Sequence, residues 1–281
     1  LAGVANRTVE SSQTAVDKFE LGEAYPTWLH LIEDPEIDAI CIGTWPYMHS
    51  TITLAALDNG KHVLCEARMS MNSLEARDMY AASVANPDLT TQIVPPPHLM
   101  ACEKHLMDLI ADGFIGEVVN VNIRVTDGSS YPDSDAEAHW RQMRELSGNN
   151  VMTTGIWYEN LMRLVGTASS VSANAQIVVP YRRGWDGNRY PMTIPDQLDV
   201  IYSLAGGGSV NMTVTTVSGS FAPPTEIWIF GTEGTLRIEV GGLDVDPKIT
   251  GARKGDQVMS EIVVPDEKRG SWRVEEEFIN A

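Results

Sequence analysis

Residues 38–66 read DAICIGTWPYMHSTITLAALDNGKHVLCE and decide the fold, because they contain a complete strand–helix–strand unit. Asp38 to Gly43 is a continuous apolar run, which is typical of a strand covered on both faces of a sheet. Thr51 to Asp58 has the pattern of a helix, and Asn59-Gly60 is a helix stop signal. His62 to Cys65 is the next strand. This spacing predicts two parallel strands joined by a right-handed crossover.

The same alternation continues on both sides of this unit. It predicts a strand over Leu1–Ala5, helices over Glu10–Leu21 and Tyr25–Ile32, a helix over Ser73–Ala85 capped by Asn72 or Ser73, and a strand over Thr91–Val94. We therefore expect an α/β fold with a doubly wound parallel sheet. Pro95-Pro96-Pro97 is the strongest boundary signal in the chain.

After these prolines the pattern changes to helices followed by consecutive strands. We expect helices over Glu103–Ala111, Val151–Leu164 and Ser271–Ala281, and strands over Glu117–Val125, Ser169–Val179, Gln197–Leu204, Ser209–Thr215, Glu226–Phe230 and Thr235–Glu239. Gly206-Gly207-Gly208 between two of these strands indicates a hairpin turn, because no helix follows it to bind a phosphate. This order predicts an α+β domain with a large, mainly antiparallel open sheet.

The composition narrows the class of partner. The chain has 38 acidic and 20 basic residues and a net charge of −18, which repels nucleic acid and anionic membranes and favours a small neutral substrate. Local basic spots such as Arg182 and Arg183 could override this overall charge. No apolar run approaches the roughly 18 residues of a membrane-spanning helix. The three cysteines include no CxxC pair, which favours reduced thiols in a cytoplasmic protein.

Four short motifs occur in a fixed order along nearly the whole chain. They are TWPYMH at Thr44–His49, GKHVLCE at Gly60–Glu66, GFIGE at Gly113–Glu117 and GTEGTL at Gly231–Leu236. Together these segments resemble the Gfo/Idh/MocA family of oxidoreductases, although each is weak alone. The resemblance implies hydride transfer between NADP or NAD and a sugar or polyol hydroxyl. It also implies a homo-oligomer that assembles through the C-terminal sheet.

Members of this family begin with a strand, a GxGxxG loop and a helix that together bind the cofactor's pyrophosphate. The sequence contains no such motif. We therefore expect the strand over Leu1–Ala5 to match the family's second strand, with both termini truncated and the first strand and glycine loop missing. On this interpretation residues 1–97 form a partial dinucleotide-binding domain. Residues 98–281 form the α+β substrate and oligomerisation domain.

The residues after the first predicted strand bear on whether the cofactor is NAD or NADP. Asn6-Arg7-Thr8 lies where a carboxylate that binds the ribose would select NAD, and no carboxylate is present. Arg7 could pair with a 2′-phosphate, which favours NADP, or it could be an ordinary solvated loop residue. By resemblance, Thr44, Pro46 and His49 lie at the nicotinamide end of the cofactor and Glu66 lies near its ribose. His49 could instead be an exposed residue at a helix N-terminus.

The catalytic positions depart from the family pattern. Ala67 and Arg68 stand where the family has Lys and Pro, and Thr153 and Trp157 replace the Asp and His of its D-x-G-x-H motif. Neither Thr nor Trp can act as a general base near neutral pH. The loss of the usual groups leaves open a second interpretation, a non-catalytic dinucleotide or sugar sensor on the same fold.

Replacement groups lie in the same segments. Arg68 could stabilise a developing alkoxide, and a neighbouring cation would favour the ionised form of Tyr158 as a base. His98 could exchange protons at the mouth of the interdomain cleft, or it could be an ordinary linker residue. Trp157 could stack on a sugar, with Glu159 beside it, or it could pack in the core.

A metal site is not expected. His98, Cys102 and His105 follow helical spacing, but no fourth ligand is evident and Pro97 makes it doubtful that His98 is helical.

Overall fold

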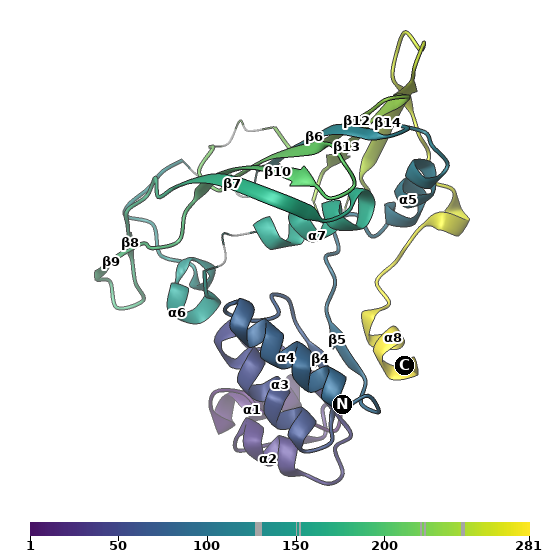
Figure 1. The fold of residues 1–281 in the computed structure, drawn as a ribbon. Helices are drawn as coiled ribbons and strands as arrows, with labels where there is room; N and C mark the ends of the chain where they lie inside the picture. The colour runs from purple at the N-terminus through teal and green to yellow at the C-terminus, as the bar shows by residue number, and fades with distance from the viewer. Residues whose placement is uncertain (127–130, 150, 152, 220, 222, 243–244) are drawn as a thin grey trace. The chain divides into compact units, whose positions relative to one another are not determined.

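The computed structural model describes residues 1–281 except 127–130, 150, 152, 220, 222 and 243–244 (Figure 1). Its internal contacts divide the chain into two compact units. The first unit comprises Leu1–Pro95, Glu145–Gly148 and Arg273–Ala281, and the second comprises Pro96–Arg144 and Asn149–Trp272. The division into domains after residue 97 stays a prediction.

The first unit contains short parallel strands that alternate with helices. Its elements are β1 (Gly3–Val4), α1 (Val9–Phe19), β2 (Glu23–Ala24), α2 (Trp28–Glu33), β3 (Ala39–Ile42), η1 (Pro46–Met48), α3 (His49–Asp58), β4 (His62–Cys65), α4 (Ser73–Ala85), β5 (Thr91–Ile93) and α8 (Val274–Asn280). Strand β1 pairs with β2, and β3, β4 and β5 pair in that order, all in parallel. The predicted Rossmann-like parallel sheet is therefore confirmed. Among the described residues, no strand pairs with the second edge of β1 or of β3.

Side-chain caps fix where the helices of this unit begin. The Thr8 side chain accepts a hydrogen bond from the backbone N–H of Ser11 at the start of α1. The Asn72 side chain accepts bonds from the N–H groups of Leu74 and Glu75, which confirms Asn72 as a cap of α4. Each cap satisfies N–H groups that the helix itself cannot bond.

The prediction that β3 is covered on both faces is wrong. Ile40 and Ile42 are buried, but Ala39 and Cys41 on the opposite face are exposed. Helices α3 and α4 contribute Ile52, Ala56 and Met79 to the core on the first face. On the second face, Leu64 packs with Val94, Val274 and Phe278. The short helix α8 thus covers β4 and leaves β3 exposed.

The second unit is built on one eight-stranded sheet. Its order is β15 (Ser260–Glu261), β14 (Lys248–Arg253), β13 (Gly234–Val240), β12 (Thr225–Gly231), β6 (Val118–Thr126), β11 (Ser209–Thr215), β10 (Gln197–Leu204) and β7 (Ala168–Gln176). Strands β6 and β11 are parallel, and every other neighbouring pair is antiparallel. The predicted large, mainly antiparallel sheet is confirmed. The predicted hairpin joins β10 to β11, with positive φ at Gly207 and Gly208.

Helices α5 (Glu103–Ala111) and α7 (Thr154–Val165) pack on one face of this sheet (Figure 1). The shared core includes Leu106 of α5, Leu161 of α7 and Val121 of β6. Burial alternates along the central strands β6 and β11, and exposed polar side chains such as Asn122 and Arg124 lie on the other face. Helix α7 begins three residues later than predicted, and Met152 of the predicted range lies outside the described residues.

Several short elements have no counterpart in the sequence prediction. They are β2, the hairpin of β8 (Tyr181–Arg183) and β9 (Arg189–Pro191), the sheet strands β14 and β15, and the one-turn helices η2 (Trp140–Gln142), α6 (Arg144–Ser147) and η3 (Asp266–Lys268). Most contain only two to four residues, too few to show a periodic pattern.

Candidate functional site

The loop after β1 uses two of its three predicted cofactor residues to hold helix α1. The backbone N–H of Asn6 donates to Ser12 Oγ at 2.8 Å, and Asn6 Nδ2 donates to the Ser11 carbonyl at 3.1 Å. Thr8 is the N-cap of the helix. Arg7 between them is exposed. The local fold therefore presents Arg7 to solvent and fixes its neighbours.

Arg7 lies over the ring of Trp45, with its guanidinium carbon 5.3 Å from the ring centroid. Trp45 belongs to the loop after β3, so this cation–π contact joins two strand-end loops. Stacking leaves the N–H edge of a guanidinium available to an anion, and that edge suits a phosphate. The residues present thus fit a dinucleotide with a 2′-phosphate.

His49 is fully buried and connects the ends of two strands. Its Nε2 lies 2.8 Å from the Thr44 carbonyl oxygen, and its Nδ1 lies 2.7 Å from the Arg68 carbonyl oxygen. A carbonyl can only accept, so a ring N–H of His49 donates to an oxygen in this pair of contacts. His49 holds the backbone that follows β3 against the backbone that follows β4. This burial excludes the exposed helix-end alternative raised from the sequence.

The other residues predicted at this edge differ in exposure. Thr44 and Glu66 are exposed, and Pro46 is buried at the start of η1. Glu66 Oε2 accepts a hydrogen bond from the N–H of Ala67 at 3.2 Å, which leaves its other carboxylate oxygen open to solvent. The strand ends thus present Arg7, Thr44 and Glu66, while Pro46 and His49 shape the backbone beneath them.

Arg68 is held by a residue that the sequence analysis did not identify. Arg68 Nη1 donates to Ser147 Oγ at 2.8 Å, and Ser147 is fully buried. The adjoining Gly148 approaches the loop after β4 so closely that a Cβ there would lie 2.2 Å from the Met71 carbonyl oxygen. Ser147 is 79 residues away from Arg68 in sequence, and no motif connects them.

The residues predicted on α7 serve mainly in packing. Trp157 is 2% exposed and belongs to the core, and the His98 ring lies 4.8 Å from the Trp157 ring. The Tyr158 hydroxyl accepts a hydrogen bond from the N–H of Ala168 at 3.2 Å. Glu159 forms an ion pair with Arg163 at 3.0 Å.

Tyr158 also packs edge-on against Tyr202, with ring centroids 5.8 Å apart. Thr153, at the position of the family's Asp, has a buried hydroxyl with no hydrogen-bond partner among the described residues. The thiol of Cys102 and the imidazole of His105, considered above as metal ligands, are both buried. Burial raises the pKa of Cys102 to about 12 and lowers the pKa of His105.

Two sequence models of one family match the chain. Residues 1–91 match the model of an oxidoreductase family with an NAD-binding Rossmann fold, and residues 104–237 match the GFO/IDH/MocA C-terminal domain. The chain belongs to the Gfo/Idh/MocA family. The resemblance drawn from the four motifs is thereby confirmed, and the first unit contains the family's NAD-binding fold.

Similar proteins in this family include sugar and diol dehydrogenases. Levoglucosan dehydrogenase of Pseudarthrobacter phenanthrenivorans is 23% identical over 83% of this chain and 63% of that protein. Trans-1,2-dihydrobenzene-1,2-diol dehydrogenase of Mus musculus is 22% identical over 90% of this chain and 71% of that protein. The chain thus spans less than two thirds of the length of the first of these relatives.

A solved structure of levoglucosan dehydrogenase in complex with NADH and L-sorbose has the same fold. It superimposes with a TM-score of 0.85 at 20% identity and covers 100% of this chain and 78% of that chain. Among the described residues of our chain, none of the helices combines the length and the apolar composition needed to cross a bilayer.

Proposed function

We propose that the whole protein is an NAD(P)-dependent oxidoreductase that transfers hydride between the cofactor and a hydroxyl of a neutral sugar or polyol. The observation that carries this proposal is the NAD-binding Rossmann domain over residues 1–91. Its exposed strand-end residues Arg7, Thr44 and Glu66 lie where open α/β sheets bind ligands. The relatives that are sugar and diol dehydrogenases support a hydroxylated substrate.

We propose that the preferred cofactor is NADP. Arg7 is exposed and stacked on Trp45, and the loop Asn6-Arg7-Thr8 offers no carboxylate to a ribose. A charge-assisted pair with a 2′-phosphate is worth about 1.5–3 kcal/mol, or roughly ten- to a hundredfold. Arg7→Ala should therefore remove most of the NADP/NAD ratio of kcat/KM, whereas Lys18→Ala on α1 should leave that ratio unchanged. An unchanged ratio in Arg7→Ala would contradict the assignment.

The chemistry needs a group that takes the hydroxyl proton and a donor that stabilises the alkoxide. When bound, the nicotinamide supplies the hydride acceptor or donor. Arg68 stays protonated and is a suitable donor, and its bond to Ser147 restricts its rotamer. We assign the transfer of the substrate's hydroxyl proton to Tyr158. His98 is the alternative residue for this role. Trp157 and Glu159 remain proposals for the substrate side, although packing and an ion pair already occupy them.

A non-catalytic sensor is the rival function. It is favoured by the three replaced positions, since Ala67, Thr153 and Trp157 stand where the family has Lys, Asp and His. The burial of Trp157, and of the Thr153 hydroxyl without a hydrogen-bond partner among the described residues, adds to this case. Dinucleotide binding without turnover on any substrate would favour the sensor.

We further propose a homo-oligomer that assembles through the open face of the eight-stranded sheet. This face carries the stacked pair Trp228 and Phe230, with ring centroids 5.8 Å apart. Arg237 of β13 bonds to Glu226 and Glu239 beside them, so the face contains both charges and aromatic area. Such mixed surfaces suit a self-complementary contact.

We also propose a cytoplasmic location for the protein. The three free cysteines support it, because reduced thiols are typical of that compartment.

The test of the oxidoreductase is an initial-rate screen of the whole protein with NAD and NADP against a panel of neutral sugars and polyols. The expected result is turnover of at least one member of the panel, faster with NADP. Failure of every substrate with both cofactors, in a protein shown to be folded, would contradict the proposed function.

A further inference from the structure

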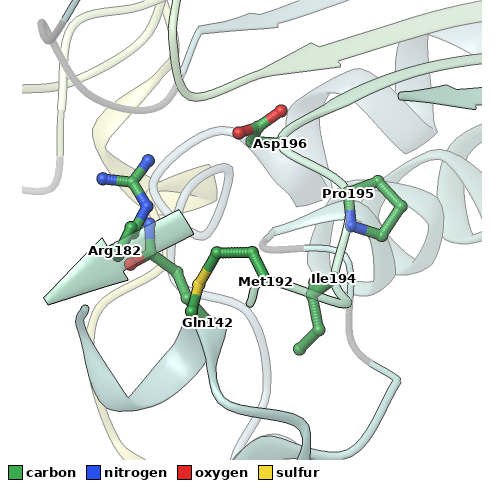
Figure 2. A pocket seen from close by; sticks show the side chains of 6 residues that line it. All are labelled: Gln142, Arg182, Met192, Ile194, Pro195 and Asp196. Carbon is green, nitrogen blue, oxygen red and sulfur yellow. The ribbon is translucent and has the colours of Figure 1, made fainter. Parts of the chain in front are cut away.

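A small pocket lies in the second unit, on the side of the β8–β9 hairpin. It is lined by Gln142, Arg182, Met192, Ile194, Pro195 and Asp196 (Figure 2). Arg182 comes from β8, Gln142 ends η2, and the other four residues precede β10. The enclosed part of the pocket measures about 10 Å³, which is room for about one water molecule or one hydroxyl oxygen.

Arg182 is buried as a residue, but its guanidinium nitrogens are not among the described buried atoms that lack a partner, so they keep contact with solvent. Arg182 is 9% exposed, and its guanidinium forms no hydrogen bond or ion pair with any residue that the structure describes. Its neighbour Arg183, in contrast, is exposed and pairs with Asp135 at 3.2 Å. Its N–H groups are therefore accessible donors, which a polar group entering the pocket can reach.

Asp196 provides a rigid acceptor in the same pocket. Its carboxylate oxygens accept hydrogen bonds from the N–H groups of Val178 at 2.7 Å and Val179 at 2.9 Å. Its backbone is also fixed, because its N–H donates to Gln176 and its carbonyl accepts from Thr216. Each carboxylate oxygen keeps a further lone pair. In the view of Figure 2 the charged ends of Arg182 and Asp196 lie on the same side of Met192.

Hydrogen bonds also hold the segment between β9 and β10, which forms part of the pocket wall. Arg144 Nη2 donates to the Thr193 carbonyl at 2.8 Å, and Arg144 Nε donates to Thr193 Oγ1 at 3.2 Å. On the opposite side, the N–H of Ala138 donates to the Arg183 carbonyl at 2.8 Å. A donor and an acceptor held this way bind a ligand with little loss of conformational entropy.

The charges decide which chemical group fits. A guanidinium can only donate hydrogen bonds, and an ionised carboxylate can only accept them. A single group placed between Arg182 and Asp196 must therefore accept from one and donate to the other, as a hydroxyl does. An anionic group would be repelled by Asp196, and an ammonium group would be repelled by Arg182. Met192, Ile194 and Pro195 supply an apolar wall for the adjoining carbon atoms.

We propose that Arg182 and Asp196 form a subsite that binds one hydroxyl group of a neutral polyhydroxy ligand. The identification of that ligand as the sugar or polyol substrate rests on the proposed function. The Gln142 carboxamide lines the same space, and its oxygen already accepts from the N–H of His139 at 2.9 Å. If the N–H₂ group turns toward this space, it supplies a second donor.

The test is the binding of L-sorbose and its monodeoxy analogues to the whole protein without cofactor, measured by calorimetry or saturation-transfer NMR. Arg182→Met should weaken L-sorbose binding at least about tenfold, whereas the matched change Arg183→Met should change it less than about twofold. One monodeoxy analogue should show the same loss with the unmodified protein and no further loss with Arg182→Met. Thermal melts, together with Arg182→Lys as a milder variant, separate lost binding from lost folding.

Several outcomes would overturn the subsite. Equal L-sorbose binding by the unmodified protein and a folded Arg182→Met variant would mean that the pocket holds water only. Tighter binding of D-gluconate than of L-sorbose, abolished by Arg182→Met, would make it an anion site. Turnover of sugars with an unchanged KM in Arg182→Met would remove the subsite and leave the proposed function intact. L-sorbose binding that depends on Arg182, in a protein that shows no hydride transfer, would support the subsite and contradict the proposed function.

Discussion

The two units of this chain build their sheets in different ways. In the first unit the strands contain two to four residues, all pairs are parallel, and β1–β2 and β3–β4–β5 form separate sheets. In the second unit eight strands of up to nine residues form one continuous sheet. Short parallel strands end in loops that expose polar side chains such as Arg7 and Glu66, whereas the long sheet forms a core that takes in Trp157. Residues that the sequence analysis singled out are therefore exposed at strand ends in the first unit, whereas Trp157 in the second unit is packed in the core.

The largest expected effect tests the packing half of this comparison. Trp157→Ala should lower the free energy of unfolding by about 3–5 kcal/mol, because it opens a cavity in the main core. Glu66→Gln, at an exposed strand end, should stay within about 0.5 kcal/mol of the unmodified protein. Urea titration followed by circular dichroism measures both. Unaltered stability of Trp157→Ala, together with a raised KM, would instead make Trp157 a sugar-stacking platform.

The next prediction concerns the residues assigned to chemistry in each unit. Arg68→Ala and Tyr158→Phe should each lower kcat by about 10²–10³, because each removes a preorganised group from the transition state. Lys104→Ala, on the solvent side of α5, is the control and should turn over at the normal rate. Near-normal kcat in both variants would end the assignment and move attention to His98.

His49 tests whether the strand ends depend on a buried connector. His49→Ala should destabilise the protein by about 1–3 kcal/mol, because it removes the ring N–H that donates to the backbone carbonyls of Thr44 and Arg68. The exposed His30 offers a matched change, and His30→Ala should cost less than about 1 kcal/mol. Equal melting temperatures for the two variants would show that the His49 bonds contribute nothing net.

The smallest effect concerns acid stability in the second unit. Hydrogen bonds from Lys104 and Lys268 lower the pKa of Asp108 to about 2. A depressed carboxyl pKa stabilises the fold above its unfolded value of about 3.9, and this contribution is lost as the pH falls from about 4 to about 2. Asp108→Asn should flatten the pH dependence of stability in that window only. The effect should be small and weakened by salt, because these groups are largely solvated.

The fold was predictable because long elements carry strong signals. The ranges Ser73–Ala85, Glu103–Ala111, Gln197–Leu204 and Ser209–Thr215 match the structure to the residue, and each has a clear period or cap. The β8–β9 hairpin was not predicted, since its strands contain only three residues each and Arg182 is the one buried residue in them. The apolar run of β3 could not reveal that α8 covers only the neighbouring strand β4 and leaves one face of β3 exposed.

The site was predictable only where the backbone fixes a direction. Residues after parallel strands lie at one edge of the sheet, so the exposure of Arg7 and Glu66 at strand ends could be expected from the sequence, while their roles stay predictions. The contact between Arg68 and Ser147 and the pocket of Arg182 and Asp196 join segments without any local pattern. Such contacts depend on tertiary packing, which a single sequence does not display.

The most direct test of the account is isotope transfer. The whole protein is incubated with NADPH carrying deuterium at nicotinamide C4 and with a neutral ketose such as L-sorbose, and the sugar product is examined by mass spectrometry. Both C4 epimers of the cofactor are used. The account predicts one deuterium on a carbon of the reduced sugar with one epimer, a faster transfer than with labelled NADH, and a large loss in Arg68→Ala. Tight binding of NADPH with no deuterium in any sugar of the panel would contradict the oxidoreductase and favour the sensor.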